Sequence, residues 1–304
     1  MSPITVAGAG PLGAATAYHL ARSGLPVTVV SDAGSTDAAY RNSGGSICWY
    51  RRDPRRSVMI RETADFVLNA VAAGARIGCR EVPYVFLSDG VQAPALNINT
   101  ADLVAYLLAE AERAGAHMRD IGRIVAVDEN DGRYRVRGER GESSAPVVVL
   151  ALGAANRVFM PGLTGAWEKR QLFVTDLPVD EHRARWPHTI AGIRDGFAYV
   201  FVKELDGQLR VLVGQEDLVD DDNPRGPSDH FAELLEAGVA EHFPFLRHAR
   251  VKEILWGLDW EGKLPHLAGE TGLVSINCGS GVRVCIAAGR VAAQAAIAAM
   301  DAPG

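Results

Sequence analysis

The stretch VAGAGPLGAATAYHLA, from Val6 to Ala21, decides how this chain begins to fold. It continues a short apolar run, Ile4–Gly10, whose terminal glycines predict a buried strand followed by a tight turn. Apolar side chains then recur at helical spacing until Gly24, and Pro26–Asp32 is a second apolar run. A strand, a helix and a strand in so short a space predict a βαβ unit, which implies a parallel sheet and a right-handed crossover.

The turn after the first strand has the pattern G-x-G-x-x-G, in which the glycines are Gly8, Gly10 and Gly13. The first glycine of such a turn permits the sharp bend, the second lets a pyrophosphate approach the backbone, and the third lets the helix pack closely on the strand. Pro11 and Leu12 complete the turn at the helix N-terminus, where free N–H groups and partial positive charge favour phosphate. The turn therefore predicts a dinucleotide-binding site.

The same pattern calls for an acidic residue near the end of the second strand, where it bonds the ribose hydroxyls. The candidates are Ser31 and Asp32, and only one can point at a ribose because neighbours on a strand face opposite ways. On this turn alone, an NAD(P)-dependent dehydrogenase is an alternative. The end of the chain argues against that class, because it holds a second glycine-rich turn and helix, NCGSGVRVCIAAGRVAAQAAIAA, from Asn277 to Ala299.

The composition narrows the range of functions. With 304 residues, of which 48% are hydrophobic, the chain is long enough for two domains with a sizeable core. A net charge of −6 gives no sign of a nucleic-acid-binding surface. None of the four cysteines forms a CxxC pair, so neither a zinc site nor a redox motif is expected. We expect no signal sequence and no run of ~20 apolar residues, hence a cytoplasmic protein without a membrane partner.

The two halves of the chain differ in pattern. Pro146–Ala154 is continuously apolar and rich in β-branched residues, which predicts a buried central strand of the parallel sheet. From Gln171 onward the pattern alternates, and a turn at Asp206–Gly207 inside GFAYVFVKELDGQLRVLVGQED predicts a hairpin. The chain is therefore expected to be an α/β protein with an antiparallel insertion in its second half.

Taken in order, several segments resemble the D-amino-acid oxidase superfamily of FAD-dependent oxidoreductases, in particular its glycine oxidase and sarcosine-oxidase-like enzymes. The segments are VAGAGPLGAATAYHLARSGLPVTVV, RNSGG, NTADLVAYLLAEAERAGA, VVVLALGA, YVFVKELDGQLRVLVG, LPHLAG and CGSGVRVCIAAGRVAA. The resemblance implies a Rossmann-like (glutathione-reductase-like) FAD-binding domain, interrupted by an α+β substrate domain built on an antiparallel sheet. We expect residues 1–78, 98–165 and 251–304 in the first domain, and residues 79–97 and 166–250 in the second.

The resemblance also implies which residues hold FAD. Some relatives attach the flavin through a cysteine near the Leu-Pro segment, and this chain has none there, so we expect non-covalent FAD. The first glycine turn would lie at the pyrophosphate, and the backbone of Ile124 would lie by the adenine. Ser43, Gly44 and Gly45 would lie by the isoalloxazine, and the second glycine turn would approach the ring from its other side. The full set of expected cofactor-binding residues is Gly8, Gly10, Pro11, Leu12, Gly13, Ser31, Asp32, Asn42, Ser43, Gly44, Gly45, Ile124, Ala151, Gly153, Gly279, Gly281, Val282 and Arg283.

Two departures from the family pattern bear on affinity and substrate. Ser31 stands where the family usually has a glutamate, which weakens the expected bond to the ribose. Asp259, in WGLDWEGKLPHLAG, stands where relatives place an arginine that clamps the substrate carboxylate. Either Arg51, Arg52 or Arg283 replaces that arginine, or Asp259 faces an amine or a basic side chain of a different substrate.

The function implied by the resemblance is oxidation of a C–N bond in an amine or amino-acid-like substrate to an imine, by hydride transfer to flavin N5. Molecular oxygen is a candidate second substrate. Tyr199 alternates with Phe197 and Phe201 on one predicted strand, so the three face one side. The missing arginine keeps a non-catalytic or partner-dependent flavoprotein subunit as an alternative. The expected catalytic residues are Tyr199, Asp259, Arg283 and Arg52.

Overall fold

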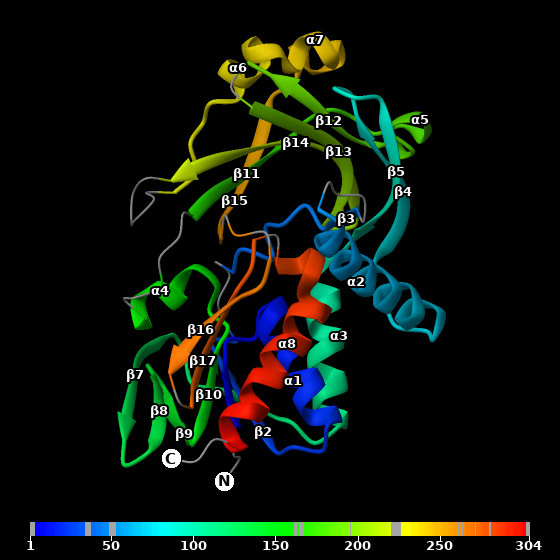
Figure 1. The fold of residues 1–304 in the computed structure, drawn as a ribbon. Helices are drawn as coiled ribbons and strands as arrows, with labels where there is room; N and C mark the ends of the chain where they lie inside the picture. Colours follow the sequence, from blue (N-terminus) through cyan, green and yellow to red (C-terminus); the bar gives the residue numbers. More distant parts are fainter. Residues whose placement is uncertain are drawn as a thin grey trace.

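The computed structural model describes residues 4–33, 38–48, 53–160, 163, 167–194, 196–219, 226–260, 262, 264–270, 272–279 and 281–301. Figure 1 shows a lower part, with a six-stranded sheet beside the long helices α1, α3 and α8. Above it lies an eight-stranded sheet, which α6 and α7 cap from the top. The molecule is therefore a mixed α/β protein with one sheet in each part.

The lower part is built on the parallel sheet that the first turn predicts. Its strand order is β16-β17-β10-β1-β2-β6, and every neighbouring pair is parallel except β16 with β17. The apolar run expected to be central, β10, lies between β1 and β17. The strands are β1 (Ile4–Ala7), β2 (Val27–Ser31), β6 (His117–Asp120), β10 (Val147–Leu150), β16 (His266–Glu270) and β17 (Leu273–Asn277).

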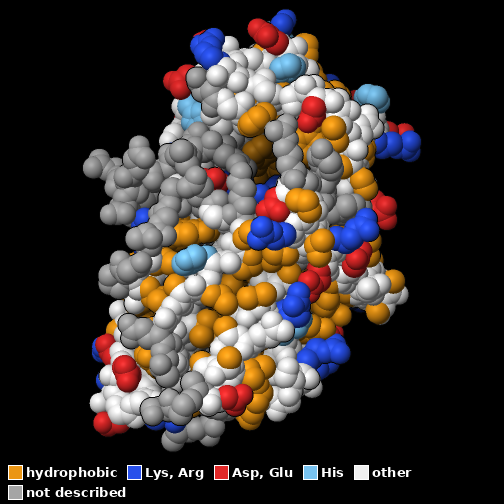
Figure 2. All heavy atoms as spheres, in the orientation of Figure 1, with side chains coloured by type: hydrophobic (Ala, Val, Ile, Leu, Met, Phe, Trp, Pro, Cys, Tyr) orange, Lys and Arg blue, Asp and Glu red, His pale blue; other side chains and the backbone are white. Residues whose placement is uncertain are grey.

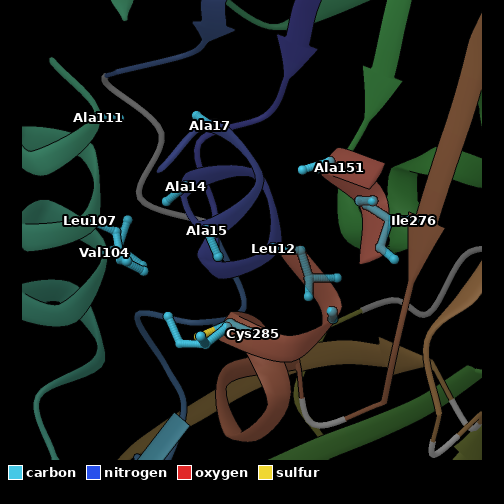
Figure 3. Close-up of a cluster of buried hydrophobic side chains, with 14 of the residues drawn as sticks. Leu12, Ala14, Ala15, Ala17, Val104, Leu107, Ala111, Ala151, Ile276 and Cys285 are labelled. Atoms are coloured by element: carbon cyan, nitrogen blue, oxygen red, sulfur yellow. The ribbon is translucent and has the colours of Figure 1, made fainter. Parts of the chain in front are cut away.

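Helices cover one face of this sheet, and a three-stranded meander covers the other. The helices are α1 (Pro11–Arg22), α3 (Thr100–Arg113) and α8 (Gly281–Asp301), with α2 (Pro54–Ala72) packed on α8; the meander is β7 (Ile124–Asn130), β8 (Arg133–Gly138) and β9 (Gly141–Ala145). The first and last helices cross closely, because a Cβ at Gly289 would lie 2.6 Å from that of Ala15. Figure 3 shows side chains of α1, α3 and α8 in one buried cluster.

Among the described residues, α8 is the one helix long and apolar enough to cross a membrane by length and composition alone. No run of this kind was predicted from the sequence, but the alanines of α8 keep its mean hydropathy at 1.4. In the structure 56% of that window is buried inside the protein, where α8 packs on α1 and α2. Such burial is typical of a helix in a protein core, so its length and composition are weak evidence for a membrane span.

The upper part is the expected antiparallel insertion. Its strand order is β15-β11-β14-β13-β12-β4-β5-β3, and every neighbouring pair is antiparallel except β12 with β4. The predicted hairpin joins β13 to β14 through Asp206 and Gly207, whose φ angles of 49° and 72° suit a two-residue type I′ turn. The strands are β3 (Ser46–Cys48), β4 (Cys79–Phe86), β5 (Val91–Ile98), β11 (Trp167–Thr175), β12 (His188–Ile193), β13 (Gly196–Leu205), β14 (Gln208–Val219) and β15 (Val251–Trp260).

Two strands lie in a different sheet from the one that the sequence-based division implies. β15 pairs with β11 in the eight-stranded sheet, although residues 251–304 were assigned as a whole to the FAD-binding domain. β3 pairs with β5 in the same sheet, although it falls within residues 1–78. The physical reason for β15 is that its Ile254 packs into the core of the upper part, where it continues the apolar face begun by Phe173.

The eight-stranded sheet has two different faces, because side chains alternate along each strand. On its outer face, Phe173, Val200 and Val213 belong to a core that includes Phe231. On its inner face, which looks toward the lower part, Leu172, Phe201 and Leu212 form a second cluster. Short helices join these strands or cap the sheet, namely α5 (Glu181–Ala184), α6 (Phe231–Leu234) and α7 (Ala240–His242). The inner face is therefore the surface that confronts the parallel sheet.

Candidate cofactor and substrate site

The glycine turn lies at the carboxyl edge of the parallel sheet, where ligands of such sheets bind. Gly8 has φ +104°, and a Cβ there would lie 2.5 Å from the carbonyl oxygen of Ala151. A Cβ at Gly13 would lie only 1.9 Å from the carbonyl oxygen of Gly8. Both glycines are therefore required by the packing of strand, turn and helix, as the motif predicts.

Gly10 is in a different environment from these two glycines. The nearest atom to a Cβ at Gly10 is Cδ1 of Tyr40 at 3.9 Å, so the space in front of this residue is open. Gly10 is also the N-cap of α1, where no side chain bonds to the helix and Pro11 occupies the first turn. Open space beside uncapped backbone N–H groups is what a pyrophosphate needs.

The second glycine turn meets the first. A Cβ at Gly281 would lie 3.6 Å from Cγ of Leu12, so the N-termini of α1 and α8 are neighbours. The N–H of Gly279 donates to the carbonyl oxygen of Gly262 at 2.6 Å, and a Cβ at Gly279 would lie 2.1 Å from the carbonyl oxygen of Trp260. Val282, which the sequence analysis placed beside the cofactor, packs into the buried core between these helices.

The two ribose candidates point to opposite faces, as the alternation requires. Oδ1 of Asp32 accepts a hydrogen bond from Arg140 at 3.0 Å, and the same guanidinium nitrogen bonds Asp120 at 2.6 Å. Asp32 therefore faces the meander side, where its charge is already paired. Ser31 follows Val29 onto the helix-covered face, so it is the better placed of the two for a ligand at this edge.

The loop from Asn42 to Gly45 joins the two parts of the molecule. Nδ2 of Asn42 donates to the carbonyl oxygen of Trp256 on β15 at 2.8 Å. Gly45 has φ +65°, and a Cβ there would lie 2.1 Å from the carbonyl oxygen of Ile98. A Cβ at Gly44 would lie 2.8 Å from Cζ of Phe201, on the inner face. The paired glycines thus let the loop pass closely between β5 and the aromatic side chain.

The loop after β10 is held by a buried asparagine that the sequence analysis missed. Asn156, the first residue of α4 (Asn156–Phe159), is fully buried, and its Oδ1 accepts from the N–H of Leu152 at 2.9 Å. Its Nδ2 lies 3.0 Å from Oδ1 of Asn277, at the end of β17. A polar residue in the apolar context LGAAN was the available signal. Of the three remaining cofactor candidates, Ala151 is buried, Gly153 (φ +59°) has open space around its Cα, and Ile124 begins β7 half-buried.

The described residues among the expected catalytic set each contact a different partner. The ring of Tyr199 lies across Gly214, and its hydroxyl donates to the carbonyl oxygen of Gln215 at 3.4 Å. Nε of Arg283 donates to the carbonyl oxygen of Ser46 at 2.8 Å, so this arginine ties α8 to β3. Arg52, like its neighbour Arg51, lies outside the described residues.

Asp259 is paired with an arginine that the sequence analysis did not single out. Its Oδ2 lies 2.9 Å from Nε of Arg170 on the adjacent strand β11, and Nη2 of Arg170 lies 2.5 Å from Oε2 of Glu168. Glu168 and Arg170 alternate with Phe173 on β11, so they belong to the inner face together with Leu172. The spacing of these residues in the sequence could not show this cluster, because the cluster forms only when β15 lies beside β11.

An aromatic stack forms another part of the inner face. The ring of His188 lies between those of Tyr84 and Phe201, with centroid distances of 4.3 and 4.5 Å. Phe197, further along the same face of β13, is 61% exposed. Figure 2 shows a hollow in the upper half of the molecule, with hydrophobic side chains on its wall and charged side chains just below it. The inner face thus offers an apolar wall with charged groups at its margin.

A family model described as FAD dependent oxidoreductase (DAO) matches residues 3–97 and 87–295. The chain belongs to this family of FAD-dependent oxidoreductases. FAD is therefore its cofactor, and the alternative of an NAD(P)-dependent dehydrogenase is abandoned. No curated protein sequence matches the chain significantly.

Solved structures of DAO-type enzymes have the same fold. Iminodiacetate oxidase from Chelativorans sp. BNC1 is 21% identical, with a TM-score of 0.76 over 97% of this chain and 95% of that one. L-proline dehydrogenase from P. horikoshii is 16% identical, with a TM-score of 0.77 over 96% and 92%. Glycine oxidase from Geobacillus kaustophilus is 17% identical, with a TM-score of 0.74 over 98% and 95%. At these identities the likeness shows the fold, including an FAD-binding part beside a sheet part.

The residues at the carboxyl edge fit FAD. The open space at Gly10 accommodates phosphate, and the uncapped start of α1 supplies donors for it. Burial, with the nearby Asp259 carboxylate second, raises the pKa of the Cys278 thiol to about 12, which keeps this cysteine protonated and unreactive. Cys48 is fully buried in an apolar cluster. Neither cysteine is in a setting that favours attack on the ring, in accord with non-covalent FAD.

Proposed function

We propose that this protein oxidises the C–N bond of a small amine or amino-acid-like substrate to an imine, with FAD as the electron acceptor. Family membership supports an FAD-dependent oxidation. The three similar enzymes are named for iminodiacetate, L-proline and glycine. In each compound the amine nitrogen is bonded to a carbon that carries a hydrogen atom. That shared chemistry is the reason for proposing an amine as the substrate.

The observation that carries the proposal is the contact between the inner face and the loop from Asn42 to Gly45. Phe201 lies against Gly44, and Asn42 bonds the backbone of β15, so the upper sheet is held over the loop expected beside the ring. When bound, FAD supplies a ring that accepts a hydride. The protein's task is then to hold the substrate C–H in place and to exclude water, which an aromatic wall does.

We assign the polar end of the substrate to the cluster of Glu168, Arg170 and Asp259. Their side chains are 10%, 23% and 21% exposed, so the charges interact where water screens them little. The two described ion pairs of this cluster join two carboxylates to one guanidinium, and carboxylates favour a protonated amine over another carboxylate. The preferred substrate therefore carries an amine or basic group remote from the reacting carbon, in contrast to a simple amino acid clamped by its carboxylate.

The test is anaerobic mixing of the FAD-loaded protein with a panel of amines: glycine, D-alanine, L-proline, iminodiacetate and the diamine putrescine. Loss of the visible absorbance of FAD reports oxidation of the amine. We expect bleaching by at least one amine, and faster bleaching by putrescine than by glycine. Glycine and D-alanine outperforming every other amine would refute the role of the cluster.

Two further outcomes separate the remaining alternatives. If no amine of the panel bleaches an FAD that dithionite does reduce, the result counts against oxidation of small amines and favours the alternative of a partner-dependent or non-catalytic flavoprotein subunit. Where an amine does bleach the FAD, admitting air tests molecular oxygen as the second substrate. Prompt return of the absorbance marks an oxidase, and slow return marks a dehydrogenase with another electron acceptor.

A further inference from the structure

Lys203 occupies an unusual place for a lysine. It follows Tyr199 and Phe201 on the inner face of β13, and the residue is only 6% exposed. Its Nζ donates to the carbonyl oxygen of Ser43 at 2.5 Å, and no carboxylate among the described residues pairs with it. Its cross-strand neighbour on β14 is a second cation, Arg210, whose guanidinium bonds Gln208.

A buried ammonium without an anionic partner is costly, because burial takes the charge out of water without compensation. Burial accordingly lowers the pKa of Lys203 from 10.5 to about 8. At neutral pH the group is still mostly protonated, so a positive charge lies one hydrogen bond from Ser43. A methionine would fill the same space at a lower cost, so packing alone does not explain a charged side chain here.

The bond from Lys203 determines how the Ser43–Gly44 peptide is oriented. The chain has no cis peptide bond among its described residues, and in a trans peptide the C=O and N–H point in opposite directions. The carbonyl of Ser43 points at Lys203, so the N–H of Gly44 points away from it. No described group accepts from that N–H, and Gly44 is partly exposed. A charged donor on the carbonyl also polarises the peptide and strengthens the N–H as a donor.

We propose that Lys203 is a positioning residue of the FAD site, which holds the Gly44 N–H toward the isoalloxazine and places a positive charge behind that peptide. The inference rests on the proposed function in one respect, namely that Ser43 and Gly44 lie beside the ring. The ring gains negative charge on reduction, so a cation behind this loop stabilises reduced FAD more than oxidised FAD. Lys203 therefore raises the midpoint potential of the bound cofactor.

The experiment compares four variants of the FAD-loaded protein. Lys203→Met removes the charge and the hydrogen bond, Lys203→Gln removes only the charge, and Lys203→Arg keeps both. Lys169→Met is the matched control, because Lys169 is a lysine of the same sheet that donates to Ser228 from the outer face. The measurement is the two-electron midpoint potential of bound FAD, by equilibration with a reference dye, together with the affinity for oxidised FAD.

We expect Lys203→Met and Lys203→Gln to lose about tenfold in the preference for reduced over oxidised FAD, which is ~30 mV for a two-electron couple. Lys203→Arg and Lys169→Met should keep the wild-type potential. A midpoint potential unchanged in both neutral variants would overturn the proposal, as would an equal fall in Lys169→Met. If Lys203→Met does not fold, Lys203→Gln decides alone, because it keeps a donor for the Ser43 carbonyl.

The proposal and the proposed function fail in distinguishable ways. An unchanged potential in a protein that still oxidises an amine defeats the role of Lys203 only. A lowered potential in the neutral variants of a protein that oxidises no amine leaves the role of Lys203 intact and defeats amine oxidation.

Discussion

The two ends of the proposed cofactor site are built in different ways. The end expected to hold the phosphates consists of backbone atoms and three glycines within the six residues Gly8–Gly13. The end expected to face the ring is held together by side chains of distant strands, and Lys203 is 160 positions from the Ser43 carbonyl that it bonds. The first end is a local structure that suits many dinucleotides. The second is assembled by the tertiary fold and holds what is particular to this enzyme.

Gly13→Val tests the local end at its packing glycine and has the largest expected effect. A Cβ at this position would lie 1.9 Å from the carbonyl oxygen of Gly8, a backbone atom that cannot turn aside. We expect the free energy of unfolding to fall by roughly 3 kcal/mol or more, with loss of FAD binding. Urea unfolding of the apoprotein measures the change.

The matched control for this variant is Gly192→Ala, because no atom lies within 4 Å of a Cβ at Gly192. It should unfold within about 0.5 kcal/mol of the wild type. A Gly13→Val protein as stable as this control would mean that α1 does not pack on its strand as closely as described.

The pH dependence of stability tests the ring end through Lys203. Its pKa is about 8 in the folded protein and 10.5 in the unfolded chain, so between these values the unfolded state binds more protons. Stability therefore rises with pH across the window, and the cost of the buried charge is fully present below pH 8. The unfolding free energy of the wild type minus that of Lys203→Met should rise by about 3 kcal/mol from pH 8 to pH 10.5.

The comparison with Lys203→Met removes other titrations from this measurement. The thiols of Cys278 and Cys285, whose pKa values burial raises to about 12, destabilise the fold at high pH in both proteins equally. A difference that stays flat between pH 8 and pH 10.5 would show that Nζ of Lys203 is accessible to water.

Gly10→Val separates ligand binding from stability within the phosphate end. The nearest atom to a Cβ at Gly10 is 3.9 Å away and φ is −72°, so a larger residue fits the apoprotein. Its side chain would occupy the space expected for phosphate. Valine is a poorer N-cap than glycine, so we expect the free energy of unfolding to fall by no more than about 1 kcal/mol. The Kd for FAD should rise about a hundredfold, which is about 2.7 kcal/mol. FAD titration by fluorescence measures it, and wild-type affinity would place the phosphate elsewhere.

Asp259→Asn has the smallest expected effect and addresses the substrate. The amide keeps the shape of the side chain but removes the charge beside Arg170. We expect the KM for putrescine to rise about tenfold, equivalent to about 1.4 kcal/mol, with little change for glycine. Steady-state kinetics with the two amines decide this, and an equal effect on both would mean that Asp259 acts only on the structure of the sheet.

Much of the fold could be predicted because its signals are local. The turn at Gly8–Gly13, the apolar run of β10 and the Asp206–Gly207 hairpin each lie within a short segment, and the structure forms all three. The membership of β15 in the upper sheet could not be predicted in this way. That strand follows β11 by more than 75 residues of chain, and only its pairing with β11 shows where it belongs.

The residues of the candidate site also separate into those predicted from local motifs and those that only the tertiary structure showed. The glycines of both turns were predicted from their motifs, and a Cβ at Gly8, Gly13 or Gly279 would collide with a backbone oxygen. Lys203 and Arg170 were missed because a lysine or an arginine is usually a surface residue, and nothing in the neighbouring sequence marks these two as different. Asn156 was missed although its apolar context was a signal, because an asparagine is also usually exposed. Asp32 was a ribose candidate until its pairing with Arg140 placed it on the meander side.

By itself, the sequence determined the parallel βαβ core, the hairpin and the family to which the chain belongs, because these depend on short-range periodicity and on glycine conformations. Only the tertiary structure decided that the N-termini of α1 and α8 meet, that Asp259 pairs with Arg170, and that Lys203 is buried against Ser43. The physical reason is that the desolvation and pairing of a charge depend on residues far away in the chain, whereas a turn depends on its neighbours.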